Sequence, residues 1–468
     1  MITALGLIYS MFITLAAGRL LFEVPALRMR DEHIGIRVPL YIMSGSLVIS
    51  LYMFLLFFLS VRFSVISISA PFLIYSLYYC LKHHYELGPT LISSYAYAKT
   101  LIGMVRERAN WIFMSALLLL TLVLISILIE NLIIPIYIGD VYCMWFFKPK
   151  AMFLAKTIPL DLFTNINLWF NTYNYPLLTS LNVAWFAICI GKWSDTVTKT
   201  FYTMQYLATI VFFYYSLKRY LNSGIAMMGT FITFCVPHVI GDLTTGYVDL
   251  IVAFYGCMAV ISLFNWMENK ENPRDLYLSA LFIGAAAWTH NEGLILFGAL
   301  ILTLFAYLFA RIIAGKIRPL NSIKDLIIFF AIYGVIYMPF KALCWHFKLK
   351  EGWVSGVGQL FAVLPNLQRI PVIFGYFCYE FFLNTYLWLY FWIFLFVIVL
   401  MNRKSIARSN VKYVLLFVFF SLALIFETFL VTNLNYLGLI ALNLDRAMLT
   451  VLPSAGFLLF ASCIKREN

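Results

Sequence analysis

Charged side chains are scarce in this chain. They make up 12% of its 468 residues, and the mean hydropathy is +0.90. Because soluble domains carry about 25% charged residues, this composition excludes a soluble globular fold. Acidic residues are the scarcer of the two charged kinds, with 21 Asp and Glu against 33 Lys and Arg. Since Lys and Arg collect beside membrane helices on the cytoplasmic side, the net charge of +12 does not indicate nucleic-acid binding.

Two other patterns are missing. The eight cysteines show no metal-ligand spacing and most lie inside apolar runs, which predicts inert, small hydrophobic side chains. The apolar runs also lack the alternation of polar and apolar residues that is typical of membrane barrels. Continuous apolar runs predict helices instead, because a helix satisfies its backbone hydrogen bonds within its own segment.

The apolar runs predict an all-α, polytopic membrane protein. About 20 apolar residues form a helix that crosses a hydrocarbon core of about 30 Å, and we expect about 13 such transmembrane helices. The first run has no cleavage signal and is expected to be retained. The expected spans are residues 2–22, 39–61, 62–82, 111–138, 200–217, 222–240, 247–267, 277–290, 294–312, 325–345, 371–401, 411–431 and 446–463.

The basic loops predict the topology. If residues 23–38, 82–110, 311–324 and 402–412 are cytoplasmic, the N-terminus and the loop 139–199 face outward. The 176–190 stretch is short for a crossing, so we expect an interfacial helix that lies in or dips into the outer surface. The protein is therefore expected to be a multi-pass protein of the cell membrane, inner or plasma, with this loop on its outer or periplasmic face.

Polar residues are expected to collect on that outer face, because they stand at helix ends that this topology places there. Acidic groups at membrane depth are costly, and together they indicate a functional site, although each alone could be a helix cap. His238, Asp242 and Asp249 could hold a divalent metal, but no ligand spacing supports it, so no cofactor is favoured. The set comprises His238, Asp242, Tyr247, Asp249, His290, Asn291, Glu292, the segment from His346 to Arg369, Asp445 and Arg446.

Several short motifs follow one another along the chain: Asp140, Trp145-Phe146, Lys148-Pro149-Lys150, Tyr175-Pro176-Leu177-Leu178, Gly246-Tyr247-Val248-Asp249, Trp288 to Gly293 and Asp445-Arg446. Their order resembles that of membrane glycosyltransferases of the GT-C class. More narrowly, it resembles bacterial members related to protein O-mannosyltransferases and lipid A aminoarabinose transferases. The resemblance covers about residues 100–460, which implies accessory transmembrane helices in 1–100 and a catalytic transmembrane domain in 101–468.

The resemblance implies an inverting hexosyl or pentosyl transferase. Such enzymes move a sugar from a polyprenyl-phosphate donor to a lipid, glycan or protein acceptor on the outer face of the membrane. Asp140 takes the place of the family's loop acid, which accepts the proton of the acceptor hydroxyl. The resemblance assigns the donor phosphate to Lys148, Lys150 and Arg446. It assigns substrate contacts to Tyr142, Tyr175, Tyr247, Asp249, His290 and Glu292.

Two departures from the family pattern leave alternatives open. Pro149 separates the two lysines and favours a short surface helix from about residue 149, so either lysine could contact the phosphate or merely reach lipid headgroups. His290 stands where relatives tend to carry a cation. Trp145, Trp169 or Trp353 could stack on a sugar or belong to the interfacial aromatic belt. A transporter or lipid flippase is the alternative function, although no repeat relates the two halves of the chain.

Overall fold

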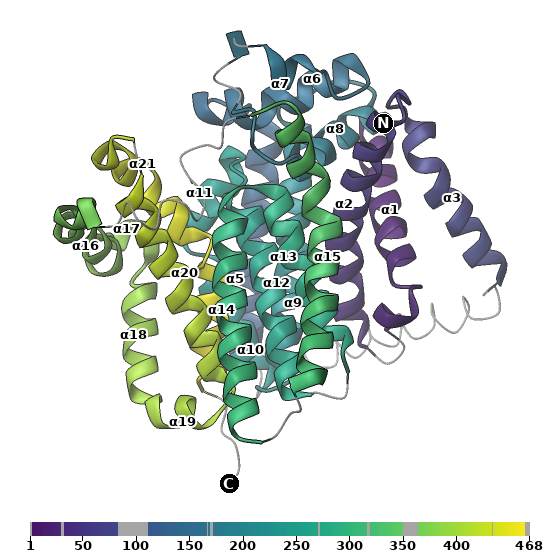
Figure 1. Cartoon of the computed structure of the whole chain (residues 1–468). Helices are drawn as coiled ribbons and strands as arrows, with labels where there is room; N and C mark the ends of the chain where they lie inside the picture. The colour runs from purple at the N-terminus through teal and green to yellow at the C-terminus, as the bar shows by residue number, and fades with distance from the viewer. Residues whose placement is uncertain are drawn as a thin grey trace.

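Helices account for all the regular structure that is described. The structure is a computed structural model that describes residues 2–29, 32–82, 111–165, 167–168, 172–269, 272–315, 319–349, 364–432 and 434–463. Within these ranges there is no β-strand, which confirms the all-α prediction. Most long helices run between two opposite ends of the molecule, one carrying α6, α7 and α8 and the other carrying α19 (Figure 1). We call these the α6–α8 end and the α19 end.

The helices fall into a long and a short group. The longer ones are α1 (Ile2–Leu21), α2 (Ile34–Phe58), α3 (Val65–Lys82), α5 (Trp111–Ile133), α9 (Thr200–Lys218), α12 (Asp249–Glu268), α13 (Arg274–Thr289), α14 (Glu292–Ile313), α15 (Pro319–His346) and α20 (Val411–Val431). The shorter ones are α6 (Phe147–Ala155), α7 (Asp161–Thr164), α8 (Leu178–Ile190), α10 (Ser223–Phe234), α11 (Pro237–Thr245), α16 (Ile370–Cys378), α17 (Thr385–Trp388), α18 (Phe391–Met401), α19 (Arg403–Arg408), α21 (Tyr436–Leu449) and α22 (Leu452–Ala461).

Fewer described helices than the expected 13 are long and apolar enough to cross a membrane. In the described ranges, eight helices are long and apolar enough to cross, or up to ten if two bent pairs each count as one span. The bent pairs are α10–α11, at 59°, and α21–α22, at 45°. The remaining expected spans correspond to α9, to α13 with its 16 residues, and to the 371–401 stretch.

The prediction of one continuous span at 371–401 is wrong. The stretch is broken into α16, a π-helical turn at Tyr379–Leu383, α17 and α18. Leu389 and Tyr390, between α17 and α18, both adopt positive φ, at 45° and 62°, so no helix passes through them. Glu380 accepts hydrogen bonds from Asn384 and Trp388 at 3.0 and 2.8 Å. The polar side chains of the broken segment therefore bind to one another.

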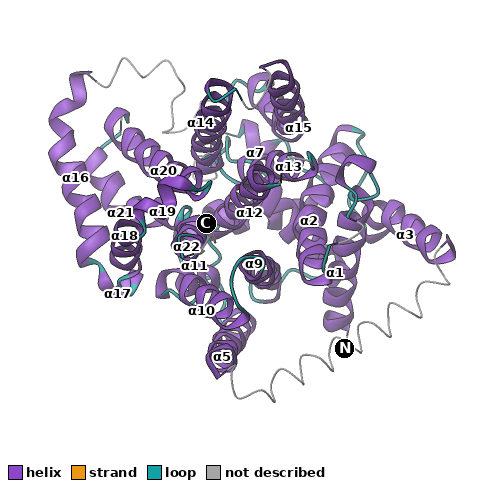
Figure 2. Cartoon of the chain, turned by 90° about the horizontal axis from the view of Figure 1, so that it is seen from below, coloured by secondary structure: helices purple, strands orange, loops and turns teal. Residues whose placement is uncertain are grey.

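The core is centred on α12, in which every residue except Glu268 is buried. Figure 2 shows α12 surrounded by other helices, and it packs against α13, α14, α20, α22 and α9. By contrast, α3 and α5 lie at the periphery, with only a few of their apolar side chains buried. Exposed apolar helix surfaces of this length are typical of helices that contact the hydrocarbon core of a membrane.

The 176–190 stretch is enclosed by protein, so the prediction of an interfacial helix there is wrong. All residues of α8 except Cys189 are buried, and the helix packs against α1, α2 and α6. Asn182 on α8 donates to the carbonyl of Ser46 on α2 at 2.9 Å. The sequence could not separate the two cases, because an apolar run suits a lipid surface and a protein interior equally well.

The N-terminal helices are built into the bundle. Tyr255 on α12 donates to the carbonyl of Met43 at 2.9 Å, and Trp288 on α13 donates to the hydroxyl of Ser50 at 3.0 Å. Gln205 on α9 reaches the hydroxyl of Ser46 at 2.6 Å. The predicted boundary at residue 100 lies outside the described residues, and these bonds tie α2 directly to helices of the proposed catalytic part.

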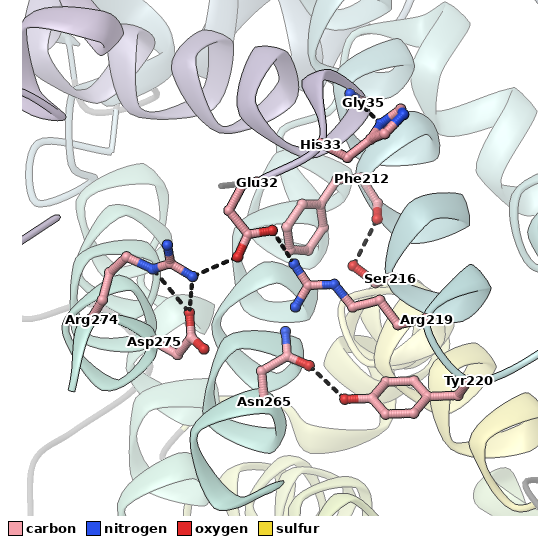
Figure 3. Close-up of polar contacts among 10 residues, drawn as sticks. All are labelled: Glu32, His33, Gly35, Phe212, Ser216, Arg219, Tyr220, Asn265, Arg274 and Asp275. Carbon is pink, nitrogen blue, oxygen red and sulfur yellow. Dashed lines mark hydrogen bonds and ion pairs between the residues drawn. The ribbon is translucent and has the colours of Figure 1, made fainter. Parts of the chain in front are cut away.

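The α19 end carries a network of ion pairs (Figure 3). Glu32, in the turn between α1 and α2, accepts hydrogen bonds from Arg219 and from Arg274, the latter at 2.6 Å. Arg274 also pairs with Asp275 at 3.4 Å. Because Arg219 follows α9 and Arg274 begins α13, the network fastens three turns of the bundle to one another.

Candidate functional site

Polar side chains from sequence-distant helix ends meet near the α6–α8 end. They come from α11 and the α11–α12 turn, from the α13–α14 turn and from α21, and half of them are buried while the others are half-buried. We call this group the polar cluster. Its members are His238, Asp242, Tyr247, Asp249, His290, Glu292, Asp445 and Arg446.

Arg446 connects the members of the polar cluster. Its guanidinium donates two hydrogen bonds, 3.0 and 2.7 Å long, to the same oxygen of Asp249, Oδ2. The guanidinium also lies over the ring of Tyr247, 3.9 Å from the centroid. Asp249 is fully buried, while 18% of the Arg446 side chain is exposed. The arginine therefore neutralises a buried carboxylate and still offers part of its surface to a ligand.

His290 and Glu292 lie beside this pair. The imidazole Nδ1 is 3.8 Å from Glu292 Oε2, and both side chains are almost fully buried. The rings of Trp145 and Tyr175 contact the imidazole edge-on at centroid distances of 5.1 and 4.5 Å. Burial lowers the pKa of His290 to about 4, so the ring is neutral at physiological pH.

The backbone explains why two carboxylates are tolerated there. Asp249 is the first residue of α12 and Glu292 the first of α14, and a helix N-terminus favours negative charge. Gly246 ends α11 with φ at +91°, a conformation that glycine adopts without strain. A Cβ on Gly293 would come 2.2 Å from the carbonyl oxygen of Ala286, so only glycine allows this tight α13–α14 turn.

The two bent helix pairs position two further members of the polar cluster, His238 and Asp445. His238 lies on α11 after the α10–α11 bend, and Asp445 lies on α21 before the α21–α22 bend. Nε2 of His238 is 3.7 Å from Asp445 Oδ2. Broken helices at membrane depth are tolerated where protein or a water-filled cavity surrounds them, and they are common at binding sites.

Asp140 lies at the exposed edge of the polar cluster. It precedes a π-helical turn, Val141–Phe146, and is exposed to solvent. Phe146 packs so closely on the α11–α12 turn that a Cβ on Gly246 would meet its ring at 2.9 Å. Burial raises the pKa of the neighbouring Tyr247 phenol, Arg446 opposes this shift, and the Asp140 carboxylate adds to it. Asp140 therefore lies within electrostatic range of Tyr247.

Lys148 is a buried side chain that connects two parts of the 139–199 segment. It is 1% exposed, and its Nζ donates to the carbonyls of Thr172 and Tyr175 at 2.9 and 3.5 Å. Burial lowers the pKa of Lys148 to about 7. Both hydrogen bonds go to backbone carbonyls, so Lys148 ties α6 to the 172–175 segment.

Lys150 and Tyr142, the other predicted residues of this segment, contact each other nearer the surface. Nζ of Lys150 is 6.0 Å from the Tyr142 ring, and 43% of Tyr142 is exposed. Both lysines lie in the short helix α6, whose start at Phe147 agrees with the helix expected from about residue 149. Nothing in these contacts joins Lys150 or Tyr142 to the buried part of the polar cluster.

Trp145 and Lys199 have structural contacts that sequence reasoning missed. Trp145 is buried and stacks on Tyr175 at 5.1 Å with 8° between the rings, so it is a wall of the His290 pocket. Lys199 is fully buried and donates to the carbonyl of Thr244 at 2.9 Å, where it caps the C-terminus of α11. The partner of Lys199 lies 45 residues further along the chain, so only the fold reveals this contact. Trp169 and Trp353 lie outside the described residues.

The polar cluster combines features of a site for an anionic substrate. It has a partly exposed guanidinium and a buried acid, Asp249, that orients it, and the exposed carboxylate of Asp140 lies at its edge. The chain matches no protein-family model, no curated protein and no solved structure. The chemistry of the polar cluster is therefore the main guide to function.

Proposed function

We propose that the chain is an inverting membrane glycosyltransferase that moves a sugar from a polyprenyl-phosphate donor to an acceptor hydroxyl. The observation that supports this proposal best is the geometry of Arg446 between Asp249 and Tyr247 with Asp140 at the exposed edge. A cation for the leaving phosphate and a carboxylate for the incoming hydroxyl are the two groups that such a transfer requires.

In the proposed reaction the acceptor oxygen attacks the anomeric carbon of the donor sugar. The bond between that carbon and the phosphate oxygen breaks, and polyprenyl phosphate leaves with the bonding electrons. Asp140 accepts the proton of the acceptor hydroxyl, and Arg446 binds the phosphate through the part of its guanidinium that Asp249 does not occupy. One displacement inverts the anomeric configuration. The loop lysines and Tyr142, Tyr175 and Tyr247 stay proposed contacts to the donor.

An apolar cavity offers a path for the prenyl chain. It has a volume of about 400 Å³ and lies between α10, α18 and α22. Trp388, in its wall, contacts His238 edge-on at 5.0 Å, and His238 in turn faces Asp445 beside Arg446. A chain in this cavity would have its phosphate next to the polar cluster. Apolar walls suit a prenyl chain, since its burial is driven by the hydrophobic effect.

The proposed orientation places the polar cluster on the outer face of the membrane. The basic helix α19 (Arg403–Arg408) lies at the far end of the molecule, as does the turn that carries Arg219 and the turn that carries Arg274. Positively charged turns favour the cytoplasmic side. The arrangement we propose is GT-C-like, with about 13 crossings. A site on the outer face would have no access to nucleotide sugars, so its donor would have to be linked to a lipid.

Lipid binding to the purified protein tests this proposal. In native mass spectrometry we expect a long-chain polyprenyl phosphate to be retained as one molecule per protein. The matched controls are the polyprenol of the same length, which lacks the phosphate, and a phospholipid of the same charge. Retention that does not distinguish the phosphate from the alcohol would contradict the proposal.

A further inference from the structure

Three members of the polar cluster form a compact set of ligand atoms. One nitrogen of His290 and one carboxylate oxygen each of Asp249 and Glu292 lie within 4.8 Å of one another. The three residues are 0%, 3% and 5% exposed, in the order Asp249, His290 and Glu292. Each has a buried polar atom without a hydrogen-bond partner, namely Asp249 Oδ1, His290 Nε2 and Glu292 Oε2. Buried polar atoms are normally paired, so three together indicate a ligand.

The charges of the polar cluster favour a cation. The carboxylates of Asp242, Asp249 and Glu292 all act on one guanidinium, that of Arg446. These three buried carboxyl groups share a single guanidinium. Acidic groups inside a protein are normally paired or coordinate a metal, so a divalent ion is a fitting second partner. Arg446 does not occupy the set itself, because both of its bonds go to Oδ2 of Asp249.

We propose that Asp249, His290 and Glu292 bind a divalent transition-metal ion, with zinc or manganese as the best fit. Two carboxylate oxygens and one imidazole nitrogen are ligands of both ions. Bonds of about 2.0–2.2 Å to a common ion hold ligand atoms about 3.0–3.6 Å apart, so the set would contract from its present span of up to 4.8 Å when it binds the ion. Three protein ligands leave a coordination position open, as in zinc sites that bind a substrate or water.

The open position has a use in the proposed reaction. The metal would lie beside the guanidinium of Arg446, so a phosphate oxygen could bind both cations. This role rests on the proposed glycosyl transfer, whereas metal binding itself does not. The sequence offered His238, Asp242 and Asp249 as possible ligands without favouring a metal; of these only Asp249 belongs to the set, and His238 is directed at Asp445.

The metal content of the purified protein tests the proposal without any donor lipid. The protein in detergent is stripped with a chelator, incubated with ZnCl₂ or MnCl₂, freed of excess ion, and analysed by inductively coupled plasma mass spectrometry. We expect about one equivalent of metal. Binding should also raise the melting temperature, since a ligand that binds only the folded state stabilises it.

Variants identify the ligands. Glu292→Gln and His290→Gln should each retain less than about a tenth of an equivalent while eluting normally in gel filtration. Asp242→Asn is the matched control, because it removes a buried acid of the same polar cluster outside the set, and it should retain the metal. A wild-type protein without stoichiometric metal, or equal retention by wild type and Glu292→Gln, would overturn the proposal. Equal loss in Asp242→Asn would also overturn it, by showing attraction to diffuse negative charge. Failure of polyprenyl-phosphate binding with metal retained would contradict only the proposed function.

Discussion

Arg446 illustrates how one residue can serve both folding and binding. Its two hydrogen bonds to Asp249 stabilise a buried carboxylate, so replacing it with Ala would leave that charge unpaired, at a cost of about 3–5 kcal/mol. Arg446→Lys keeps the charge but loses the planar pair of donors. We therefore expect Arg446→Lys to fold and to bind polyprenyl phosphate about tenfold more weakly.

Arg369→Lys is the control for that experiment. Arg369 also faces an aromatic ring, that of Tyr436 at 4.8 Å, but it donates to the carbonyls of Leu430 and Thr432 at the end of α20. Its substitution should leave lipid affinity unchanged. Equal affinities of wild type and Arg446→Lys, measured by titration in native mass spectrometry, would remove Arg446 from the phosphate site.

Lys148 is expected to make stability depend on pH. Burial lowers its pKa from 10.5 to about 7, so folding favours the neutral amine. The resulting stabilisation is complete above pH 10.5, the unfolded value, and is lost as the pH falls through about 7. The melting temperature of the wild type should therefore rise from pH 7 to pH 9.5, about one unit below the unfolded pKa. In Lys148→Met this rise should be smaller, whereas Lys150→Met should keep it. Parallel melting curves for wild type and Lys148→Met would contradict this assignment.

At the scale of residues, the sequence indicated which polar groups gather but not what each one contacts. The order of Tyr247, Asp249, His290 and Glu292 along the chain suggested a common site, and the structure brings these residues together. The contacts of Lys148 with two backbone carbonyls could not be predicted from the sequence. A long, flexible side chain can reach many groups, and the folded loop determines which of them lie within hydrogen-bond distance. Trp145 was likewise open to either a sugar or a membrane interface, and the structure packs it on Tyr175.

At the scale of elements, the ion pairs of Glu32 fasten the α1–α2 turn to α9 and α13 (Figure 3). Glu32→Gln keeps the size of the side chain but removes the charge between two arginines. Because Glu32 and Arg274 are mostly buried, we expect the free energy of unfolding to fall by about 1–3 kcal/mol. Arg28→Gln is the control, since its pair with Glu23 is exposed and such pairs contribute about 0–1 kcal/mol. Equal unfolding midpoints for wild type and Glu32→Gln would show that the network does not fasten the turns.

The sequence predicted the helices better than their breaks. Long apolar runs such as α5 and α20 were found with the right type and within a few residues of their ends, because twenty apolar residues allow little else at membrane depth. The break at Leu389 and Tyr390 was missed because neither glycine nor proline marks it. The surroundings of α8 were missed because hydrophobicity does not distinguish lipid from protein as a neighbour.

For the whole molecule, the orientation in the membrane decides which donor the site could use. With the exposed Cys80 and Cys463 and the other native cysteines replaced, single cysteines at Leu160 and Ser405 probe the two ends of the molecule. Leu160 is 51% exposed near the α6–α8 end, and Ser405 is exposed on α19. We expect Leu160→Cys to react with a membrane-impermeant thiol reagent in intact cells, and Ser405→Cys to react only after lysis. The reverse pattern would place the polar cluster in the cytoplasm and allow a nucleotide-sugar donor.

Release of polyprenyl phosphate from its sugar-linked form tests the central claim most directly. Membranes from cells that produce the wild type, Asp140→Asn or no protein are given a panel of polyprenyl-phosphate hexoses and pentoses, with the acceptors those membranes contain. We expect at least one donor to be consumed in a manner that requires the protein, and the rate to fall about a hundredfold or more in Asp140→Asn, because the acceptor hydroxyl then has no base. If the folded wild type consumes no donor beyond the protein-free membranes, or if Asp140→Asn is as fast as the wild type, the proposed reaction or the proposed base is wrong.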